Sequence, residues 1–552
     1  MNSILTAQSF WKEWDADAPL ATTVIKETTD EFNKVKEVYF SGTKKNDGVV
    51  RIFGRLTMRK TAVKPPCIVI IGEPHNHIGV PEIELAMDEG YAVFEFDYGG
   101  EHPTEARYTL YPESLSYCNY FRDPNLMKSI TPNPFDSLWY EWTAVVRRAV
   151  KQAASFAEVD TKKIALLGMG DGAVNVWRVC ALEPRIRGGA ILLGTEQSPP
   201  ENNNTDNDSL RYLAALSPKN YLTFLERSVF VEIASNDTNG YFDTMSGFFN
   251  FLPQANNSLL SVTERSEHMV GLKQRPNLGL WFKTIFSEKQ PLIYRPTLKA
   301  VQSENKLYYE LKTNNPNLKI ESVEVFYSYG ELEPGYRNWT TLPAEFVGDG
   351  EYIIKAPIFD TNAPINCFAT IKFENSYCLS TRLVKKIPSK LGITNAEKIG
   401  HTRLLYDNSM GTDCFSAGTN GIFMNEDSLK MAVGPHNIEG VTSLSGILIT
   451  NKPCDKSYQA FAESLLQLEL WSSSPSTIKI TAIARFDGGD TESFSVDFPI
   501  SGGKIWSKAT LNANEFKTKD GTYHLESFEN VVQLQIISSK DNPVVVSSML
   551  WL

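Results

Sequence analysis

Short apolar runs alternate with helix-like stretches over residues 36–290, and this alternation limits the fold more than any other feature of the sequence. Each run ends in small or polar residues. Such runs are typical of strands buried on both faces, as in a parallel sheet covered by helices. We therefore predict a doubly wound α/β domain whose sites lie at the carboxyl ends of its strands. The runs are CIVIIG (67–72), YAVFEFDYGG (91–100), KIALLG (163–168), GGAILLG (188–194) and SVFVEIAS (228–235).

The clearest helix between these runs is predicted in DSLWYEWTAVVRRAVKQAASF, residues 136–156. Leu138, Trp142, Val145 and Ala149 recur at helical spacing, which predicts one buried face. Asp136 is a residue type that can cap the start of a helix, so we expect the helix to begin there.

Two later regions are predicted to be all-β. Strand-like runs such as KLYYELKT and CFATIKFEN, separated by turn residues, predict a small antiparallel sandwich of immunoglobulin-like size over residues 295–388. A longer series that includes LLQLELWSS and PVVVSSMLWL predicts a jelly-roll sandwich over residues 400–552. We place the three domains at 1–292, 293–390 and 391–552.

Composition fits several folded domains and disfavours two classes of partner. A chain of 552 residues is too long for one hydrophobic core. Its net charge of −11 disfavours nucleic acid or an anionic membrane surface as the main partner. Because no apolar run reaches about 18 residues, we expect no membrane-spanning segment.

The N-terminus and the cysteines favour a cytoplasmic location. The start, MNSILTAQSFWKEWD, has neither a basic opening nor an apolar core, so we expect no signal peptide. The seven cysteines are scattered, without a CxxC pair or zinc-type spacing, which favours reduced thiols. Secretion stays open if a leader has been removed, and the sequence leaves the oligomeric state open.

The segment IALLGMGDGAVNVW, residues 164–177, predicts a buried strand, a sharp glycine turn and a helix. Gly168, Gly170 and Gly172 alternate through the turn. Glycines in this pattern indicate that the turn packs tightly against neighbouring backbone.

Five segments follow one another in a defined order along residues 36–290. They are GVVRIFGRLTMRK…KPPCIVIIGEPHNH, DEGYAVFEFDYGG, DTKKIALLGMGDGA, VFVEIASNDTNGYFD and SEHMVG. Their order and spacing resemble those of the α/β-hydrolase superfamily, and within it the acetyl xylan esterases and dienelactone hydrolases. The resemblance covers about half of the chain. It implies the fold class α/β, with an α/β-hydrolase domain followed by the two all-β sandwich domains.

The resemblance implies a Ser–Asp–His triad, of which this chain keeps two members. The family carries its nucleophile in Gly-x-Ser-x-Gly on the strand-to-helix turn. Here Gly170 stands at the serine position, Asp237 at the position of the acid and His268 at that of the histidine. The resemblance therefore implies a catalytically degenerate ester hydrolase, or one whose nucleophile was removed by substitution.

The resemblance also implies backbone donors for an oxyanion, at Glu73 and Asp171. A backbone N–H does not depend on the side chain, but a Glu73 carboxylate facing the pocket would repel an oxyanion. Asp171 is also an alternative nucleophile, because some hydrolases of this fold use an aspartate at the turn. That alternative needs a register shift of one residue, which places the bulky Met169 where a small residue is expected.

Each of these residues also has an interpretation without chemistry. Gly170 fits a glycine-rich turn, Asp237 a loop aspartate in an Asx-turn, and His268 a surface histidine before a helix.

The loop GEPHNH holds candidate metal ligands. Glu73, His75 and His77 are ligand types that suit zinc. Their spacing is not a strong signature, and loop hydrogen bonding is the favoured role. We expect no metal and no cofactor.

Aromatic residues of the last region make it a candidate binding module. The region resembles carbohydrate-binding jelly rolls, and Trp471 and Trp506 are the predicted substrate-binding residues, with Trp551 a further candidate by type. Aromatic faces stack on pyranose rings, although tryptophans also form cores. In the middle region we predict Trp339 to be a core residue.

Two functions from different classes remain. One is a carbohydrate-directed ester hydrolase, or its descendant, acting on a small-molecule or glycan ester. The other is a non-catalytic protein that keeps the hydrolase pocket to bind a glycan or small molecule. Whether the chain is an enzyme stays open at this point.

Overall fold

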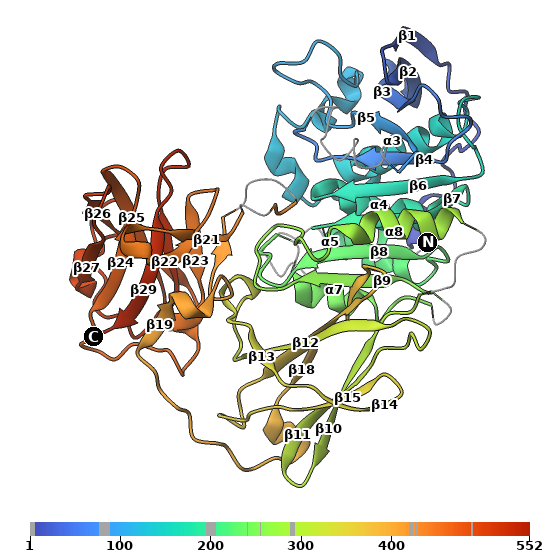
Figure 1. Cartoon of the computed structure of the whole chain (residues 1–552). Coiled ribbons are helices and arrows are strands. Elements are labelled where there is room, and N and C mark those ends of the chain that lie inside the picture. Colours follow the sequence, from blue (N-terminus) through green and yellow to red (C-terminus); the bar gives the residue numbers. More distant parts are fainter. Residues whose placement is uncertain are drawn as a thin grey trace. The chain divides into compact units, whose positions relative to one another are not determined.

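A computed structural model of the chain is shown in Figure 1. The structure describes residues 6–76, 89–194, 206–239, 241–253, 256–287, 293–418, 423–425, 428–486 and 489–552. The chain forms two compact units. The first comprises Met1–Glu232, Asp243–Leu260 and Pro276–Arg295, and the second comprises Ile233–Phe242, Ser261–Arg275 and Pro296–Leu552.

A nine-stranded mixed sheet organises the first half of the chain (Figure 1). Its strand order is β1-β2-β3-β5-β4-β6-β7-β8-β9. The strands β5, β4, β6, β7 and β8 are mutually parallel, whereas β1, β2 and β3 pair antiparallel and β3 joins β5 antiparallel. The bounds are β1 Thr23–Thr29, β2 Asn33–Lys45, β3 Gly48–Arg59, β4 Cys67–Ile71, β5 Ala92–Phe96, β6 Ile164–Met169, β7 Ile186–Leu192, β8 Val229–Ala234 and β9 Leu259–Thr263.

The five parallel strands coincide with the five predicted apolar runs, which confirms the α/β prediction. Every residue of β4, β5, β6 and β8 is buried, as expected for strands covered on both faces. The antiparallel ribbon β1–β3 lacks such runs, because its strands are long, half-exposed and rich in charge.

Helices cover both faces of this sheet. A Cβ built on Gly189 would contact Val176 of helix α4 (Asp171–Leu182), and one built on Gly188 would contact Ile285 of helix α8 (Pro276–Phe286). Because successive residues of a strand point to opposite faces, α4 and α8 lie on opposite sides of β7. In the described part of the chain the other α-helices are α1 Ala7–Phe10, α3 Leu138–Ala153, α5 Asn207–Leu216, α6 Lys219–Leu222 and α7 Phe242–Phe248.

The predicted helix at 136–156 is confirmed, but its predicted cap is wrong. Helix α3 begins at Leu138, and the side chain of Ser137 accepts the hydrogen bond from the backbone N–H of Trp139. Asp136 instead ends a short 3-10 turn, Pro134–Asp136. Both residue types cap helices well, so propensity alone does not separate two adjacent candidates.

Two antiparallel sheets follow in the middle of the chain. One has the order β10-β11-β15-β14, and the other has the order β13-β12-β16-β17 with β18 also paired to β16. Trp339 is buried beside Phe368 of this region, which confirms its predicted place in a core. The bounds are β10 Thr297–Ser303, β11 Lys306–Lys312, β12 Ile320–Tyr329, β13 Thr340–Leu342, β14 Glu345–Gly348, β15 Glu351–Lys355, β16 Ile365–Phe373, β17 Cys378–Ser380 and β18 Val384–Lys386.

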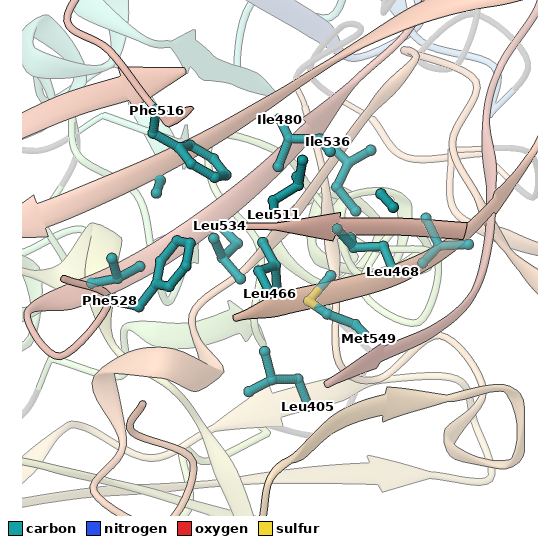
Figure 2. Close-up of a cluster of buried hydrophobic side chains, with 14 of the residues drawn as sticks. Leu405, Leu466, Leu468, Ile480, Leu511, Phe516, Phe528, Leu534, Ile536 and Met549 are labelled. Atoms are coloured by element: carbon teal, nitrogen blue, oxygen red, sulfur yellow. The ribbon is translucent and has the colours of Figure 1, made fainter. Parts of the chain in front are cut away.

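Two further antiparallel sheets form the C-terminal region. Their orders are β21-β22-β29-β24-β27, with β19 also paired to β29, and β20-β23-β28-β25-β26. Apolar side chains from both sheets form one buried cluster, part of which is labelled in Figure 2. The bounds are β19 Leu404–Asp407, β20 Ser416–Ala417, β21 Lys430–Val433, β22 Glu439–Thr442, β23 Ile447–Thr450, β24 Leu466–Trp471, β25 Ser476–Arg485, β26 Thr491–Ile500, β27 Ser507–Leu511, β28 Val531–Ile537 and β29 Val545–Trp551.

The chain thus has the predicted order of an α/β region followed by antiparallel β regions. The domain boundaries at 292 and 390 stay a prediction. Among the described residues, no helix is long and apolar enough to cross a membrane.

Replacing Trp551 should weaken the C-terminal core far more than replacing Trp471. Trp551 is 1% exposed, packs against Phe528 and donates its indole N–H to the carbonyl of Tyr458. Trp551→Ala should therefore cost about 3–5 kcal/mol of unfolding free energy, whereas the half-buried Trp471 should cost about 1–2 kcal/mol. Urea denaturation of the full chain measures both, and equal losses would contradict this burial difference.

Candidate active site

Gly170 lies at the apex of the turn that joins β6 to α4. Its dihedral angles are φ 51° and ψ −124°, a backbone conformation that residues with a Cβ rarely adopt. Its N–H donates to the carbonyl of Leu192, at 3.0 Å, and its own carbonyl accepts from Ala173, at 3.1 Å. Asp171 is the first residue of α4, so it lies beyond the apex that the alternative nucleophile would need to occupy.

The two flanking glycines are required by close packing. A Cβ on Gly168 would lie 2.6 Å from Cα of Ala173, and one on Gly172 would overlap the carbonyl oxygens of Ile71 and Gly72. Both obstacles are backbone, which cannot move aside without disturbing the turn. The tight packing predicted from the glycine pattern is therefore present.

A carboxylate faces the position where a nucleophile's side chain would begin. A Cβ built on Gly170 would lie 2.9 Å from Cδ and 3.0 Å from Cγ of Glu73, and would overlap its Oε1. The Glu73 side chain is 25% exposed. Of the two orientations open to Glu73, the structure thus has the one in which the carboxylate points toward Gly170.

Neighbouring residues hold the Glu73 carboxylate in place. Nε2 of His75 lies 3.2 Å from Oε2 of Glu73, and Nδ2 of Asn76 donates to the same oxygen at 3.3 Å. The N–H of Asn76 also donates to the backbone carbonyl of Glu73, at 3.0 Å. This loop geometry agrees with the hydrogen-bonding role favoured for His75.

Two tyrosines, Tyr98 and Tyr120, lie near the Glu73 and Asp171 carboxylates. The hydroxyl of Tyr98 donates to the carbonyl of Gly72 at 2.7 Å. Burial raises the pKa of Tyr98 well above its usual value, and the charges of Asp171 and Glu73 add to this shift. The same causes, in the same order, raise the pKa of Tyr120. The surroundings of Gly170 are therefore acidic and phenolic, with two carboxylates from different elements.

Asp237 and His268 form a hydrogen-bonded pair in the second unit. Asp237 follows β8, His268 follows β9, and Nδ1 of His268 lies 2.9 Å from Oδ2 of Asp237. Asp237 is completely buried, whereas the His268 side chain is 23% exposed. This is the hydrogen bond that the predicted triad requires. The grouping of the pair with Gly170, and the catalytic role of all three, stay predictions.

The loops that carry this pair are anchored on a segment of the middle region, residues 334–339. Asn236 donates from Nδ2 to the carbonyls of Pro334, at 2.9 Å, and Arg337, at 2.8 Å. Arg265 donates from Nε to the carbonyl of Trp339, at 2.8 Å. The side chain of Asn451, from the C-terminal region, reaches the same segment at the carbonyl of Gly335. The position of the Asp237–His268 pair therefore depends on β regions outside the α/β sheet.

Glu267 is a titratable neighbour that sequence reasoning missed. Burial, followed by the charge of Asp237, raises its pKa from 4.5 to about 7. A glutamate next to a candidate histidine was a visible signal, but its burial depends on tertiary packing. A carboxyl with a strongly raised pKa next to a candidate histidine is itself a candidate functional group.

Asp97, in the motif FDYGG, has a structural role. It is buried and accepts hydrogen bonds from the N–H groups of Gly99 and Thr109. Burial raises its pKa to about 6, although these hydrogen bonds act in the opposite direction. The carboxylate thereby organises the turn that ends β5.

The structure separates the three candidate tryptophans of the C-terminal region. Trp551 is a core residue, so its candidacy for ligand binding was wrong. Trp471 is half-buried and lines a concavity of about 420 Å³ together with Pro435, His436 and Lys504. Trp506 lies next to Trp471, with ring centroids 6.3 Å apart, but supports the wall at Gly434 rather than lining the concavity.

A metal site finds no support in the described part of the chain. No group of three histidine, cysteine, aspartate or glutamate side chains there could hold a metal ion. Glu73 and His75 are in contact, while His77 lies outside the described residues.

Strand order and the conformation of the turn together decide the architecture. From β2 onward the strands follow the order β2-β3-β5-β4-β6-β7-β8-β9, and the sharp turn comes directly after β6. This combination is typical of a single known fold. The first half of the chain has an α/β-hydrolase fold.

Solved structures of esterases are similar to about half of this chain. An acetyl xylan esterase from Paenibacillus sp. R4 is 18% identical, with a TM-score of 0.39, over 48% of this chain and 88% of that one. Acetyl xylan esterase 1 from Thermoanaerobacterium sp. JW/SL YS485 is 14% identical, with a TM-score of 0.40, over 52% and 96%. A glucuronoyl esterase from Solibacter usitatus is 15% identical, with a TM-score of 0.36, over 49% and 87%.

These similarities concern the fold alone, over about half of the chain. No family model matches the sequence, and no curated protein does.

Replacing Glu267 by glutamine should stabilise the protein at pH 8. A carboxyl whose pKa is higher in the folded chain keeps its proton there, so the free energy of unfolding falls as pH rises from 4.5 to about 7. Glu267→Gln removes this titration. Its gain over the native chain should be smallest below pH 4.5 and should rise by on the order of 2 kcal/mol towards pH 8.

Urea denaturation at a series of pH values measures this difference. The exposed Glu526→Gln in the C-terminal region is the matched control and should show no such trend. A Glu267→Gln difference that stays constant across pH would contradict the assigned environment.

Proposed function

We propose that the α/β-hydrolase region descends from a carbohydrate-directed ester hydrolase and recognises a small-molecule or glycan ester without serine-type turnover. The observation that carries this proposal is the apex of the turn, where Gly170 has no side chain and Glu73 presents its carboxylate. A turn of this geometry has a use in ester chemistry only if a nucleophile projects from it.

Two features that a serine hydrolase would need are present, and they support descent from such an enzyme rather than present hydrolytic activity. The Asp237–His268 hydrogen bond is what a serine would need for activation, and the tight glycine turn is what would display it. Removal of a triad nucleophile costs roughly six orders of magnitude in rate. Selection for turnover would not keep glycine at this position, whereas recognition does not depend on it.

The native chain should neither hydrolyse acetyl esters nor react with a fluorophosphonate probe. Without a hydroxyl at position 170, no activated serine is expected at the turn. Acetylated xylo-oligosaccharides and p-nitrophenyl acetate test turnover, and mass spectrometry after probe treatment tests labelling, with an active serine esterase as positive control.

Hydrolysis that persists in His268→Ala would indicate a contaminant or another site. Hydrolysis that is lost in His268→Ala would contradict the proposal. If an ester of the substrate acid were then trapped on Asp171, the alternative nucleophile would be correct. Calorimetric titration of the native chain with acetylated xylo-oligosaccharides tests recognition, and absence of binding at millimolar concentration would count against it.

A second function is proposed for the C-terminal region, the binding of a glycan at the concavity of Trp471. Its indole N–H donates to the carbonyl of Gly503 at 2.8 Å, and that of Trp506 donates to the carbonyl of Pro435 at 3.1 Å. These bonds hold both rings in fixed orientations. His436 and Lys504 supply polar groups at the rim of an aromatic platform, the combination that suits a sugar ring.

Trp471→Ala should weaken glycan binding by about tenfold or more, since one stacking contact is of the order of 1.4 kcal/mol. Trp506→Ala should act less, because Trp506 supports the wall behind Gly434. Titration of the full chain with plant and bacterial oligosaccharides, followed by tryptophan fluorescence, measures both effects.

Tyr523→Ala is the matched control, because Tyr523 is 68% exposed in the same region and does not line the concavity. If no glycan binds at millimolar concentration, or if Tyr523→Ala weakens binding as much as Trp471→Ala, the concavity is not the binding site.

A further inference from the structure

Gly170 and Glu73 fit one another as a matched pair. Of the three glycines in the turn, Gly170 is the one at which the three atoms nearest to an added Cβ all belong to a single side chain, that of Glu73. For Gly168 and Gly172 the obstacles include backbone atoms, which are independent of sequence. The space at the apex of the turn is therefore shared by residues 170 and 73, and substitutions at these two positions can change which side chain fills it without a change of fold.

The Glu73 side chain cannot leave this space without losing contacts. Rotation of its carboxylate away from residue 170 would give up the interactions with His75 and Asn76 described above. A serine placed at 170 would thus face a negative charge even after the overlap had been relieved.

We propose that the Glu73 carboxylate occupies the place of a nucleophile's side chain at this turn and excludes one by volume and by charge. This inference rests on the proposed function, because it takes the turn to be a former nucleophile position. Its consequence is that Gly170→Ser alone does not restore a reactive serine. A carboxylate beside the turn opposes the negative charge that develops on an acyl oxygen, so both residues must change.

Three variants of residue 73 distinguish the effect of the volume of the Glu73 side chain from the effect of its charge. Gly170→Ser is combined with native Glu73, with Glu73→Gln, which keeps the volume and removes the charge, and with Glu73→Ala, which removes both. The readouts are the melting temperature and the rate at which a fluorophosphonate labels Ser at position 170, located by mass spectrometry. Glu73→Ala alone is the reference for loss of the loop contacts.

Gly170→Ser should lower the melting temperature by on the order of 5 °C, and Glu73→Ala should recover part of this loss. Labelling should be at least about tenfold faster in Gly170→Ser/Glu73→Ala than in Gly170→Ser, with the Glu73→Gln combination between them. Gly90→Ser is the matched control: Gly90 also has a positive φ, of 85°, but no atom lies within 4 Å of its Cβ position. Glu73→Ala should not recover any loss caused by Gly90→Ser.

The outcomes distinguish this inference from the proposed function. The inference would be overturned if Gly170→Ser had the same melting temperature and labelling rate with and without Glu73→Ala. Failure of the double variant to fold would also overturn it, because backbone strain at residue 170 would then be what excludes a side chain there. If Glu73→Ala restored the melting temperature of Gly170→Ser but no variant was labelled, the steric pairing of Gly170 with Glu73 would be supported. The proposed descent from a serine hydrolase would then be wrong, because a serine at the turn would not be reactive.

Discussion

The close packing of the turn between β6 and α4 is the constraint on which the candidate site depends. Gly168 and Gly172 lie so near to Ala173 and to the end of β4 that no side chain fits at either position. Between these two glycines the chain passes through a positive φ at Gly170, and α4 begins at the next residue. The same geometry that would display a nucleophile is therefore kept by the scaffold whether or not a nucleophile is present, because neighbouring backbone maintains it.

The candidate acid and base depend on a different set of contacts. Asp237 and His268 sit on loops whose neighbours, Asn236 and Arg265, donate hydrogen bonds to residues 334–339 of the middle region. The C-terminal region supports the same segment through Asn451. The β regions thus help to position the Asp237–His268 pair. This explains why the loops after β8 and β9 form one compact unit with the β regions.

Patterns that follow from local chemistry were predicted well. Parallel strands are buried on both faces, so five apolar runs sufficed to place β4 to β8, and the glycine pattern placed the turn. The hydrogen bond between Asp237 and His268 followed from the order of motifs along the chain. Predictions that depended on choosing between equivalent residue types were weaker. Ser137 rather than Asp136 caps α3, and of three similar tryptophans Trp551 proved to be core.

The sequence by itself determined the α/β architecture followed by β regions, the turn at Gly170 and the absence of a side chain there. These depend on periodicity, on glycine and on residue identity, which are local properties. The tertiary structure alone decided that the Glu73 carboxylate faces Gly170, that Glu267 is half-buried near Asp237, and that residues 334–339 hold the loops of the candidate pair. Each of these three contacts is between residues that are far apart in the sequence. The direction in which their side chains point is set by tertiary packing, which no local sequence pattern encodes.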